Sequence, residues 1–398
     1  MSGGGLLSVA EAQARILALG AVMAPEEVPL IEAADRWAAA DVLARRDQPA
    51  ADLSAMDGYA LRFADLSGPL TVVGESKAGE GLARGLVQGQ AARIFTGAPM
   101  PAGADTVLVQ EEAARDGDVL RLAGEGPPRI GAHVRRRASD FAAGARLVGT
   151  GERWTAARIA LAAIGGHGAL PVRRRPRVLL LSTGDELVAP GEPTSGVALP
   201  ASNGPMLHAL LRSTPAQVEE GGILPDRLER LVEGFRAAAA RADVIVTTGG
   251  ASVGDHDLVR PALARAGAEL DFWPVAMLPG KPLIAGRLGQ AVVLGLPGNP
   301  VSAFVTALLF LRPLVRHLAG DPRPLPPLSR RPLARALPAA GPRAEYLRAR
   351  MDGERVAPLD GQDSAALLAL AGADALIRRP AHASAVQAGE AVDILEIA

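Results

Sequence analysis

The chain has 398 residues, of which 48% are hydrophobic, 21% charged and 3% aromatic, and its net charge is −1. A chain of this length exceeds one ordinary hydrophobic core, so we expect about two to four domains. The balanced charge and scarce aromatic residues argue against nucleic-acid binding. The absence of cysteine excludes disulfides, thiolate metal sites and cysteine nucleophiles. With neither a signal-like N-terminus nor an apolar run of about 18 residues, the sequence predicts a cytoplasmic protein without membrane contact.

The first half of the chain predicts helices around a β-rich segment. Ser8–Glu11 has the capping-box pattern, which predicts a helix from residue 9. A second helical stretch is expected over residues 30–44. Between about residues 57 and 141, short β-type runs alternate with Gly/Pro turns, which indicates a small β-rich domain. A helical pattern returns at residues 154–164.

The second half alternates apolar runs with helical patterns, which predicts a parallel, doubly wound sheet. The predicted strands are residues 178–181, 244–247 and 291–296. The predicted helices are residues 203–212, capped by Asn203, residues 228–240, and a long helix from residue 301. The proline-rich segment 322–338 marks a boundary, and short strands beyond it indicate a small C-terminal β domain.

Polar turns that contain glycine follow the apolar runs of the second half. They are Ser182–Leu187, Thr248–Asp257, Pro279–Pro282 and Pro297–Pro300. Because ligands bind beyond the carboxyl ends of parallel strands, we expect these four loops to share one rim of the sheet. Gly249, Gly250 and Gly254 would let backbone N–H groups approach a phosphate, and Ser252 adds a hydroxyl. Neither the P-loop pattern nor the Rossmann glycine pattern is present.

Charged residues of both signs lie at this predicted rim. Lys281 is one of only two lysines among 42 basic residues, and an ammonium in a tight turn suits an oxyanion. A solvated turn lysine is the alternative. Acidic residues near the rim could supply hard oxygen ligands for Mg²⁺, or could instead be helix caps or surface charges. They are Asp185, Glu186, Asp226, Asp255 and Asp257.

Polar residues also gather in stiff segments of the β-rich region. Asp57 follows Pro49, Thr96 lies in a Pro/Gly-rich turn, and Arg135–Arg137 precede Asp140. Turns that only shape a small sheet would not require these side chains. We therefore expect a second binding surface in this region.

Taken together, these motifs resemble those of the molybdopterin molybdenumtransferase family, which includes the E domain of gephyrin. The matching segments occur in the family's order and are Ser54–Ala60, Ile94–Ala104, Ser182–Leu187, Thr247–Asp257, Pro279–Pro282 and Leu296–Ala303. Glu345–Arg348, Ser364 and Leu367 resemble the family's C-terminal domain.

The resemblance implies an α/β multidomain fold in an elongated subunit. An N-terminal helical linker region over residues 1–175 would contain an inserted β-rich domain at about residues 46–142. A doubly wound molybdopterin-binding α/β domain over residues 176–325 and a β-barrel-like C-terminal domain over residues 326–398 would follow. Family members are homodimers, which implies active sites shared between the α/β domain of one subunit and the β-rich domain of the other.

The implied reaction inserts molybdate into adenylylated molybdopterin and releases AMP with the help of Mg²⁺. The resemblance also implies contacts with the upstream adenylyltransferase and with recipient molybdoenzymes. It assigns catalysis to Lys281, Glu186, Asp57, Asp140 and Asp226, and metal binding to Asp185, Glu186 and Asp257. It assigns cofactor binding to Thr96, Arg135, Arg137, Thr183, Gly184, Gly249, Gly250, Ser252, Gly254, Pro297, Gly298, Asn299 and Pro300.

Two positions depart from the family pattern. Leu278 stands where many members have a lysine before Pro-Gly-Lys, and Ala138 stands for the glycine of the Arg-x-x-Gly-x-Asp pattern. A non-catalytic or specialised paralogue that carries the cofactor is therefore a second hypothesis. A third is the related molybdopterin adenylyltransferase, which resembles only residues 176–320; the motif Ser54–Ala60 argues against it.

Overall fold

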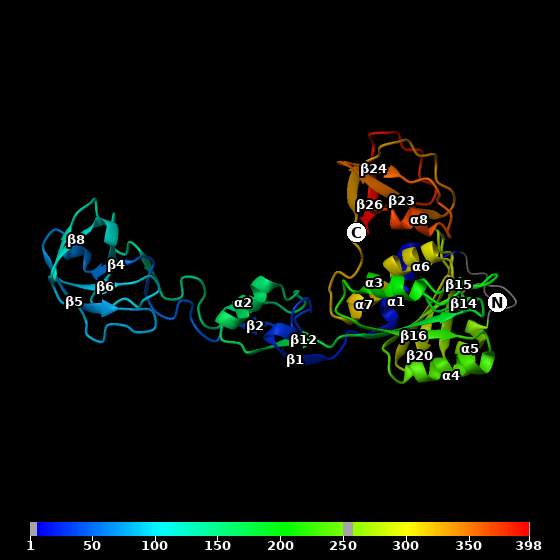
Figure 1. The fold of residues 1–398 in the computed structure, drawn as a ribbon, viewed down its shortest axis with the longest axis horizontal. Coiled ribbons are helices and arrows are strands. Elements are labelled where there is room, and N and C mark those ends of the chain that lie inside the picture. The colour runs from blue at the N-terminus through cyan, green and yellow to red at the C-terminus, as the bar shows by residue number, and fades with distance from the viewer. Residues whose placement is uncertain (1–5, 250–257, 398) are drawn as a thin grey trace. The chain divides into compact units, whose positions relative to one another are not determined.

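The computed structural model describes residues 6–249 and 258–397. It divides the chain into two compact units (Figure 1). Unit 1 consists of residues 1–26, 35–39 and 172–398, and unit 2 of residues 27–34 and 40–171. The α/β sheet and the C-terminal β domain thus belong to one unit. The predicted domain boundaries at residues 175 and 325 remain predictions.

Unit 2 is built on a six-stranded sheet in the order β7-β4-β6-β5-β9-β8, which confirms the predicted β-rich domain. Neighbouring strands are antiparallel, except that β5 and β6 are parallel. Tyr59, Leu61, Leu108 and Leu120 are among its buried core residues. Its other strands form short antiparallel pairs, β3 with β10 and β2 with β11.

The bounds of the unit 2 elements show how short most of them are. The six-stranded sheet comprises β4 (Gly58–Leu61), β5 (Leu70–Ser76), β6 (Gln90–Ile94), β7 (Thr106–Val109), β8 (Ala113–Asp116) and β9 (Val119–Leu122). The remaining elements are the 3₁₀ turns Leu30–Glu32, Phe63–Asp65 and Gln110–Glu112, strands β2 (Val42–Leu43), β3 (Leu53–Ser54), β10 (Val134–Arg135) and β11 (Arg146–Val148), and helix α2 (Ala156–Ile164). Strands β1 (Pro25–Pro29) and β12 (Ala169–Arg173) pair with each other.

The helix predicted over residues 30–44 is wrong. Only Leu30–Glu32 form a short 3₁₀ turn, Asp35 has a positive φ of 64°, and Val42–Leu43 form strand β2. A left-handed residue interrupts a right-handed helix. Tertiary pairing of β2 with β11 has overridden the helical propensity of this alanine-rich segment.

The α/β sheet of unit 1 has the order β16-β13-β17-β21-β20-β18. Its strands are β13 (Arg177–Thr183), β16 (Gln217–Leu224), β17 (Val244–Thr248), β18 (Glu269–Pro274), β20 (Pro282–Leu288) and β21 (Ala291–Leu296). The first four strands in this order are parallel; three of them, β13, β17 and β21, were predicted, whereas β16 was not, and β20 is antiparallel to both neighbours. The loop before β20 therefore lies at the edge where the parallel strands end.

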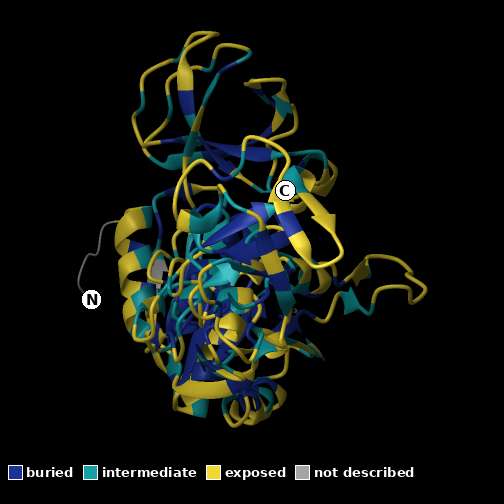
Figure 2. Cartoon of the chain, turned by 90° about the vertical axis from the view of Figure 1, so that its left-hand side faces the viewer, coloured by how far each residue is buried: buried dark blue, intermediate teal, exposed yellow. Residues whose placement is uncertain are grey.

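Alternate strand residues face two helical layers, which confirms a doubly wound arrangement. Leu180, Val246 and Leu294 pack with helices α1 (Val9–Leu19), α3 (Asn203–Leu211), α6 (Pro300–Thr306) and α7 (Arg312–Leu318). Leu179 and Ile245 face the other layer, helices α4 (Leu228–Ala239) and α5 (Val259–Ala266). The predicted capping box is confirmed, because Glu11 N–H donates to Ser8 Oγ. In Figure 2 buried residues concentrate in the strands and exposed ones in loops and outer helix faces.

One helical run of the described residues, Pro300–Leu318, is long and apolar enough by composition to cross a membrane. It joins α6 to α7 through a π-helical segment, Ala307–Leu311. Of the 18-residue stretch that meets this criterion, 78% is buried inside the structure. The run is therefore the central helix of the unit 1 core.

A second sheet of unit 1 carries the C-terminal domain, in the order β19-β23-β25-β26-β22 with β24 beside β23. The strands are β19 (Met277–Leu278), β22 (Ser329–Pro332), β23 (Ala344–Asp352), β24 (Arg355–Pro358), β25 (Ala375–Arg379) and β26 (Ala391–Glu396), and helix α8 is Leu367–Ala371. The two-residue strand β19 comes from the α/β segment and pairs with β23. Tyr346 and Leu376 pack into the same core as the α/β strands, so the two sheets are joined. The short pair β14 (Leu187–Val188) and β15 (Leu199–Pro200) completes unit 1.

Candidate active site

A cleft of about 720 Å³ opens at the carboxyl ends of β13, β17 and β21. It is lined by most of the unit 1 residues that the sequence assigned to the site: Thr183, Gly184, Glu186, Asp226, Gly249, Pro297, Gly298, Asn299 and Pro300. Gly250, Ser252, Gly254 and Asp257 lie outside the described residues. The predicted rim is therefore a cavity formed by loops that are distant in sequence.

Bare backbone forms one wall of the cleft. Gly249 has a φ of 93°, and a Cβ there would lie 2.5 Å from the carbonyl oxygen of Thr183. A Cβ on Gly298 would lie 3.5 Å from Cα of Gly249. Any side chain at position 249 would thus be strained and would collide with β13. Glycine here allows a ligand to approach the main chain closely.

Two helices begin at the cleft and give it a positive electrostatic character. Asn299 is the N-cap of α6, Pro300 is its first residue, and the helical run continues to residue 318. Ser202 is the N-cap of α3, so the predicted cap, Asn203, is instead the first helical residue. The side chain of Asn203 donates to the Gly298 carbonyl rather than closing its own helix. Helix N-termini attract anions through their free N–H groups.

Acidic residues converge on the opposite side of the cleft. The backbone N–H of Asp226 donates to Asp185 Oδ1 over 3.0 Å. Partial shielding from water, together with the charges of Asp185 and Glu186, raises the pKa of Asp226. Crowded carboxylates of this kind favour a proton or a cation nearby. Among the described residues, no set of three His, Cys, Asp or Glu side chains is arranged to bind a metal by itself.

Three enclosed side-chain oxygens have no hydrogen-bond partner among the described residues: Thr183 Oγ1 and Asn203 Oδ1, whose residues line the cleft, and Thr247 Oγ1, one residue before the lining residue Thr248. Unpaired polar atoms of this kind cost about 1–3 kcal/mol each. Sequence reasoning assigned Thr183 to the site but missed the other two. The cleft is therefore equipped for a polar ligand.

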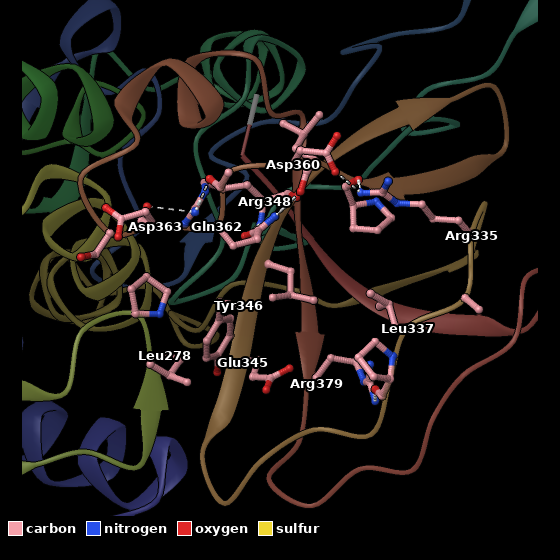
Figure 3. Close-up of a pocket in the computed structure, with 18 of the residues that line it drawn as sticks. Leu278, Arg335, Leu337, Glu345, Tyr346, Arg348, Asp360, Gln362, Asp363 and Arg379 are labelled. Atoms are coloured by element: carbon pink, nitrogen blue, oxygen red, sulfur yellow. Dashed lines mark hydrogen bonds and ion pairs between the residues drawn. The ribbon is translucent and has the colours of Figure 1, made fainter.

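A second pocket, of about 880 Å³, lies in the C-terminal domain (Figure 3). Arg348 lines it and is fully buried, and its Nη2 donates to the carbonyls of Gly361 and Asp363. Its Nε and Nη1 have no partner. Burial lowers the pKa of Arg348. An incompletely paired buried guanidinium indicates an anion site, which the sequence revealed only as part of a resemblance.

The loop that contains Lys281 separates the two cavities. Leu278 and Pro279 line the C-terminal pocket, whereas Gly280 and Pro282 line the cleft. A Cβ on Gly280 would lie 2.6 Å from the Cγ2 atom of Thr306, so the loop is packed closely on the central helix. Lys281 itself is exposed. Opposite this loop, Asn299 of the cleft donates to Ser364 of the pocket over 2.9 Å.

Some of the site residues predicted in unit 2 are hydrogen-bonded within the unit, and others are exposed. Asp57 Oδ1 accepts from both the backbone and the hydroxyl of Thr96, and these bonds lower the pKa of Asp57. Arg137 is engaged within the unit, because its Nε donates to Asp47. Among the described residues the guanidinium of Arg135 has no partner, and Asp140 is exposed. Arg135 is therefore better placed than Arg137 to bind a ligand.

Known proteins match the chain along nearly its whole length. Residues 7–166 match the MoeA N-terminal region (domains I and II), residues 179–317 a probable molybdopterin-binding domain, and residues 330–397 the MoeA C-terminal region (domain IV). The molybdopterin molybdenumtransferase of Haemophilus influenzae is 37% identical over 298 residues, covering 74% of this chain and 73% of the relative. The chain belongs to the molybdopterin molybdenumtransferase (MoeA) family.

Further matches agree with this family. Molybdopterin molybdenumtransferase 2 of Mycobacterium tuberculosis is 34% identical and covers 98% of this chain and 99% of its own length. A solved structure of the molybdopterin biosynthesis MoeA protein of Pyrococcus horikoshii has a TM-score of 0.85 at 28% identity, covering 99% of this chain and 100% of its own. These matches confirm the family and the fold expected from the sequence motifs.

Proposed function

We propose that this protein inserts molybdate into adenylylated molybdopterin and releases AMP. The observation that carries the proposal is the loop Leu278–Pro282, which borders two cavities of complementary chemistry. The cleft suits a phosphorylated ligand, and the C-terminal pocket suits an oxyanion. The relatives' names support this reading rather than a cofactor carrier or an adenylyltransferase.

In this proposal the cleft holds the adenylylated pterin. The bare backbone at Gly249 and Gly298 would bind the phosphates, assisted by the positive end of the α6 dipole; Pro300 has no N–H, and the N–H of Val301 donates to the Ser364 carbonyl. The ammonium of Lys281 would stabilise the charge that develops on the phosphate oxygens as the P–O–P bond breaks and AMP leaves. Arg348 Nε and Nη1 would hold the oxygens of molybdate beside the loop.

The acidic side of the cleft fits a magnesium ion. Glu186 and Asp226 line the cleft, with Asp185 beside them, and the pKa of Asp226 is raised first by burial and then by the negative charges of Asp185 and Glu186, which a cation would neutralise. Mg²⁺ commonly takes one or two carboxylates together with ligand phosphates and water. When bound, the ion would offset charge on the diphosphate.

We further propose that a second copy of the chain completes the cleft with Asp57, Thr96, Arg135 and Asp140. Support comes from the unpaired guanidinium of Arg135 and from Asp57, which Thr96 holds in one orientation. Both Arg135 and Asp140 are exposed, and their charged groups have no hydrogen-bond or ion-pair partner among the described residues. They are available for a ligand.

AMP release from adenylylated molybdopterin in the presence of molybdate and Mg²⁺ tests the proposed activity. We expect Lys281→Ala to slow release by about 100-fold, because a charged group at the reacting phosphates is lost. The matched control is Lys77→Ala, which removes the other lysine; Lys77 is 60% exposed and pairs with Glu75 in unit 2. A wild-type protein that binds the substrate yet releases no AMP above background would contradict the proposal.

A further inference from the structure

Asn203 joins two walls of the cleft. It is the first residue of α3, and its Nδ2 donates to the carbonyl oxygen of Gly298 over 2.7 Å. The next residue along that loop, Asn299, donates to Ser364 over 2.9 Å. The loop between β21 and α6 is thus held from both sides. Its position, and that of Asn203, is fixed independently of any ligand.

The hydrogen bond to Gly298 also fixes which way the amide of Asn203 faces. A carbonyl oxygen can only accept, so the amide nitrogen must be the atom that meets Gly298. The side-chain oxygen Oδ1 therefore points elsewhere, and within the described part of the chain it is enclosed without a hydrogen-bond partner. Asn203 lines the cleft, and its Oδ1 has almost no accessible surface of its own.

The character of this atom distinguishes it from its neighbours. Thr183 and Thr247 also carry unpaired oxygens, but a hydroxyl can donate as well as accept. Helix N-termini and glycine N–H groups donate and therefore suit phosphates. The amide oxygen of Asn203 can only accept, so it requires an N–H or O–H of the ligand. The bare backbone of Gly249 and Gly298 beside it lets a flat ring approach.

We propose that Asn203 determines specificity for the pterin: its Oδ1 accepts a hydrogen bond from the 2-amino group of the aminopyrimidinone ring. This inference rests on the proposed function, because it assumes that the cleft holds the pterin. An aminopyrimidinone presents two adjacent N–H donors, whereas the adenine of AMP presents a single amino group. A site built around a buried acceptor rejects an analogue without the donor, because the acceptor is then left unpaired.

A pair of small probes tests the proposal. In lumazine the 2-amino group of pterin is replaced by a carbonyl oxygen, so a donor becomes an acceptor at the same position. We measure by calorimetry the binding of 6-hydroxymethylpterin, 6-hydroxymethyl-lumazine and AMP. We expect the wild-type protein to bind the pterin about tenfold more tightly than the lumazine. In Asn203→Ala this ratio should fall to about twofold or less, while affinity for AMP stays the same.

The outcomes distinguish a failure of the specificity proposed for Asn203 from a failure of the proposed molybdate insertion. A wild-type protein that binds both rings equally overturns the inference and needs no variant, so poor folding of Asn203→Ala cannot hide that result. A variant that folds yet keeps the preference also overturns it, as does a loss of AMP affinity instead of pterin preference. If the wild type releases AMP in the activity assay, each of these outcomes leaves the proposed function intact. A wild type that neither binds a pterin nor releases AMP contradicts both.

Discussion

The two residues that depart from the family pattern, Ala138 and Leu278, have different structural consequences. Ala138 has a φ of 57°, which is why a glycine is favoured at this position, and its N–H donates to the Pro49 carbonyl. An alanine in this conformation costs about 1–2 kcal/mol of backbone strain but removes no ligand-binding group. Leu278 is different, because it is 39% exposed and lines the pocket that contains Arg348.

Leu278→Lys should therefore increase activity. A second ammonium at the wall of the C-terminal pocket would strengthen oxyanion binding, and we expect AMP release at low molybdate to rise about threefold to tenfold. The measurement is the initial rate as a function of molybdate concentration. Leu368→Lys is the matched control, since Leu368 is 90% exposed on α8 and should leave the rate unchanged. Equal rates for Leu278→Lys and the wild type would show that the pocket does not limit turnover.

Asp226 should show a trade-off between stability and activity. The pKa of Asp226 is raised in the folded protein, so the folded state favours the neutral, protonated carboxyl group. The stabilisation that this group contributes is lost as the pH rises through the folded pKa and the carboxylate forms. We expect Asp226→Asn to raise the unfolding temperature by about one or two degrees at pH 7, with the gain vanishing below about pH 4. AMP release should fall in the same variant. Asp116→Asn, at an exposed position in unit 2, should do neither.

At the scale of elements, the sheet is fastened at the edge opposite the cleft. Asp243, just before β17, accepts from Arg174 over 2.9 and 3.0 Å and from the backbone N–H of Arg177 over 2.8 Å. Arg177 begins β13, so the carboxylate joins the two central parallel strands. This connection holds the start of both strands, whose other ends carry Thr183 and Gly249 into the cleft.

Asp243→Asn should destabilise the protein without touching the cleft. Burial alone would raise the pKa of Asp243, but the hydrogen bonds from Arg174 and Arg177 outweigh it and lower the pKa to about 2. The stabilisation is therefore present above the unfolded pKa near 4 and is lost as the pH falls toward 2. We expect a loss of about 1–2 kcal/mol of unfolding free energy at pH 7, allowing for solvent screening. Urea unfolding at pH 7 and pH 3 measures it; an equal loss at both pH values would contradict the assignment.

At the scale of the whole molecule, the proposed active site combines residues of unit 1 and unit 2 from two copies of the chain. Lys281 belongs to unit 1 and Asp57 to unit 2 of the same chain. Each unit has a hydrophobic core of its own, so each can hold its site residues in place. A dimer could then build each site from unit 1 of one copy and unit 2 of the other.

Mixing two inactive variants tests this arrangement. Lys281→Ala and Asp57→Ala should each abolish most AMP release alone. After subunit exchange, each mixed dimer would contain one site with both defects and one with none. Random exchange should therefore restore about a quarter of wild-type activity. No recovery after confirmed exchange would show that Lys281 and Asp57 act in the same chain, whereas an Asp57→Ala variant that is active by itself would show that Asp57 is not needed.

Three of the parallel strands and the glycine loops that follow them could be predicted from the sequence alone. These features depend on local chemistry: apolar runs form buried strands, and glycine permits the backbone conformations of the loops. Residues of the motifs 182–187 and 297–300 line the cleft, and their roles in binding remain predictions. The same local reasoning failed for residues 30–44, where pairing with a distant strand outweighs helical propensity.

Only the tertiary structure decided which groups lack partners and which cavities adjoin. From the sequence, Arg348 is only part of a segment that resembles the family's C-terminal domain and Asn203 is a predicted helix cap, because hydrogen bonding depends on neighbours far along the chain. The loop at Lys281 reaches the rim only because β20 is antiparallel and β19 joins the second sheet. Strand direction and sheet membership are set by long-range packing, and no local pattern encodes them.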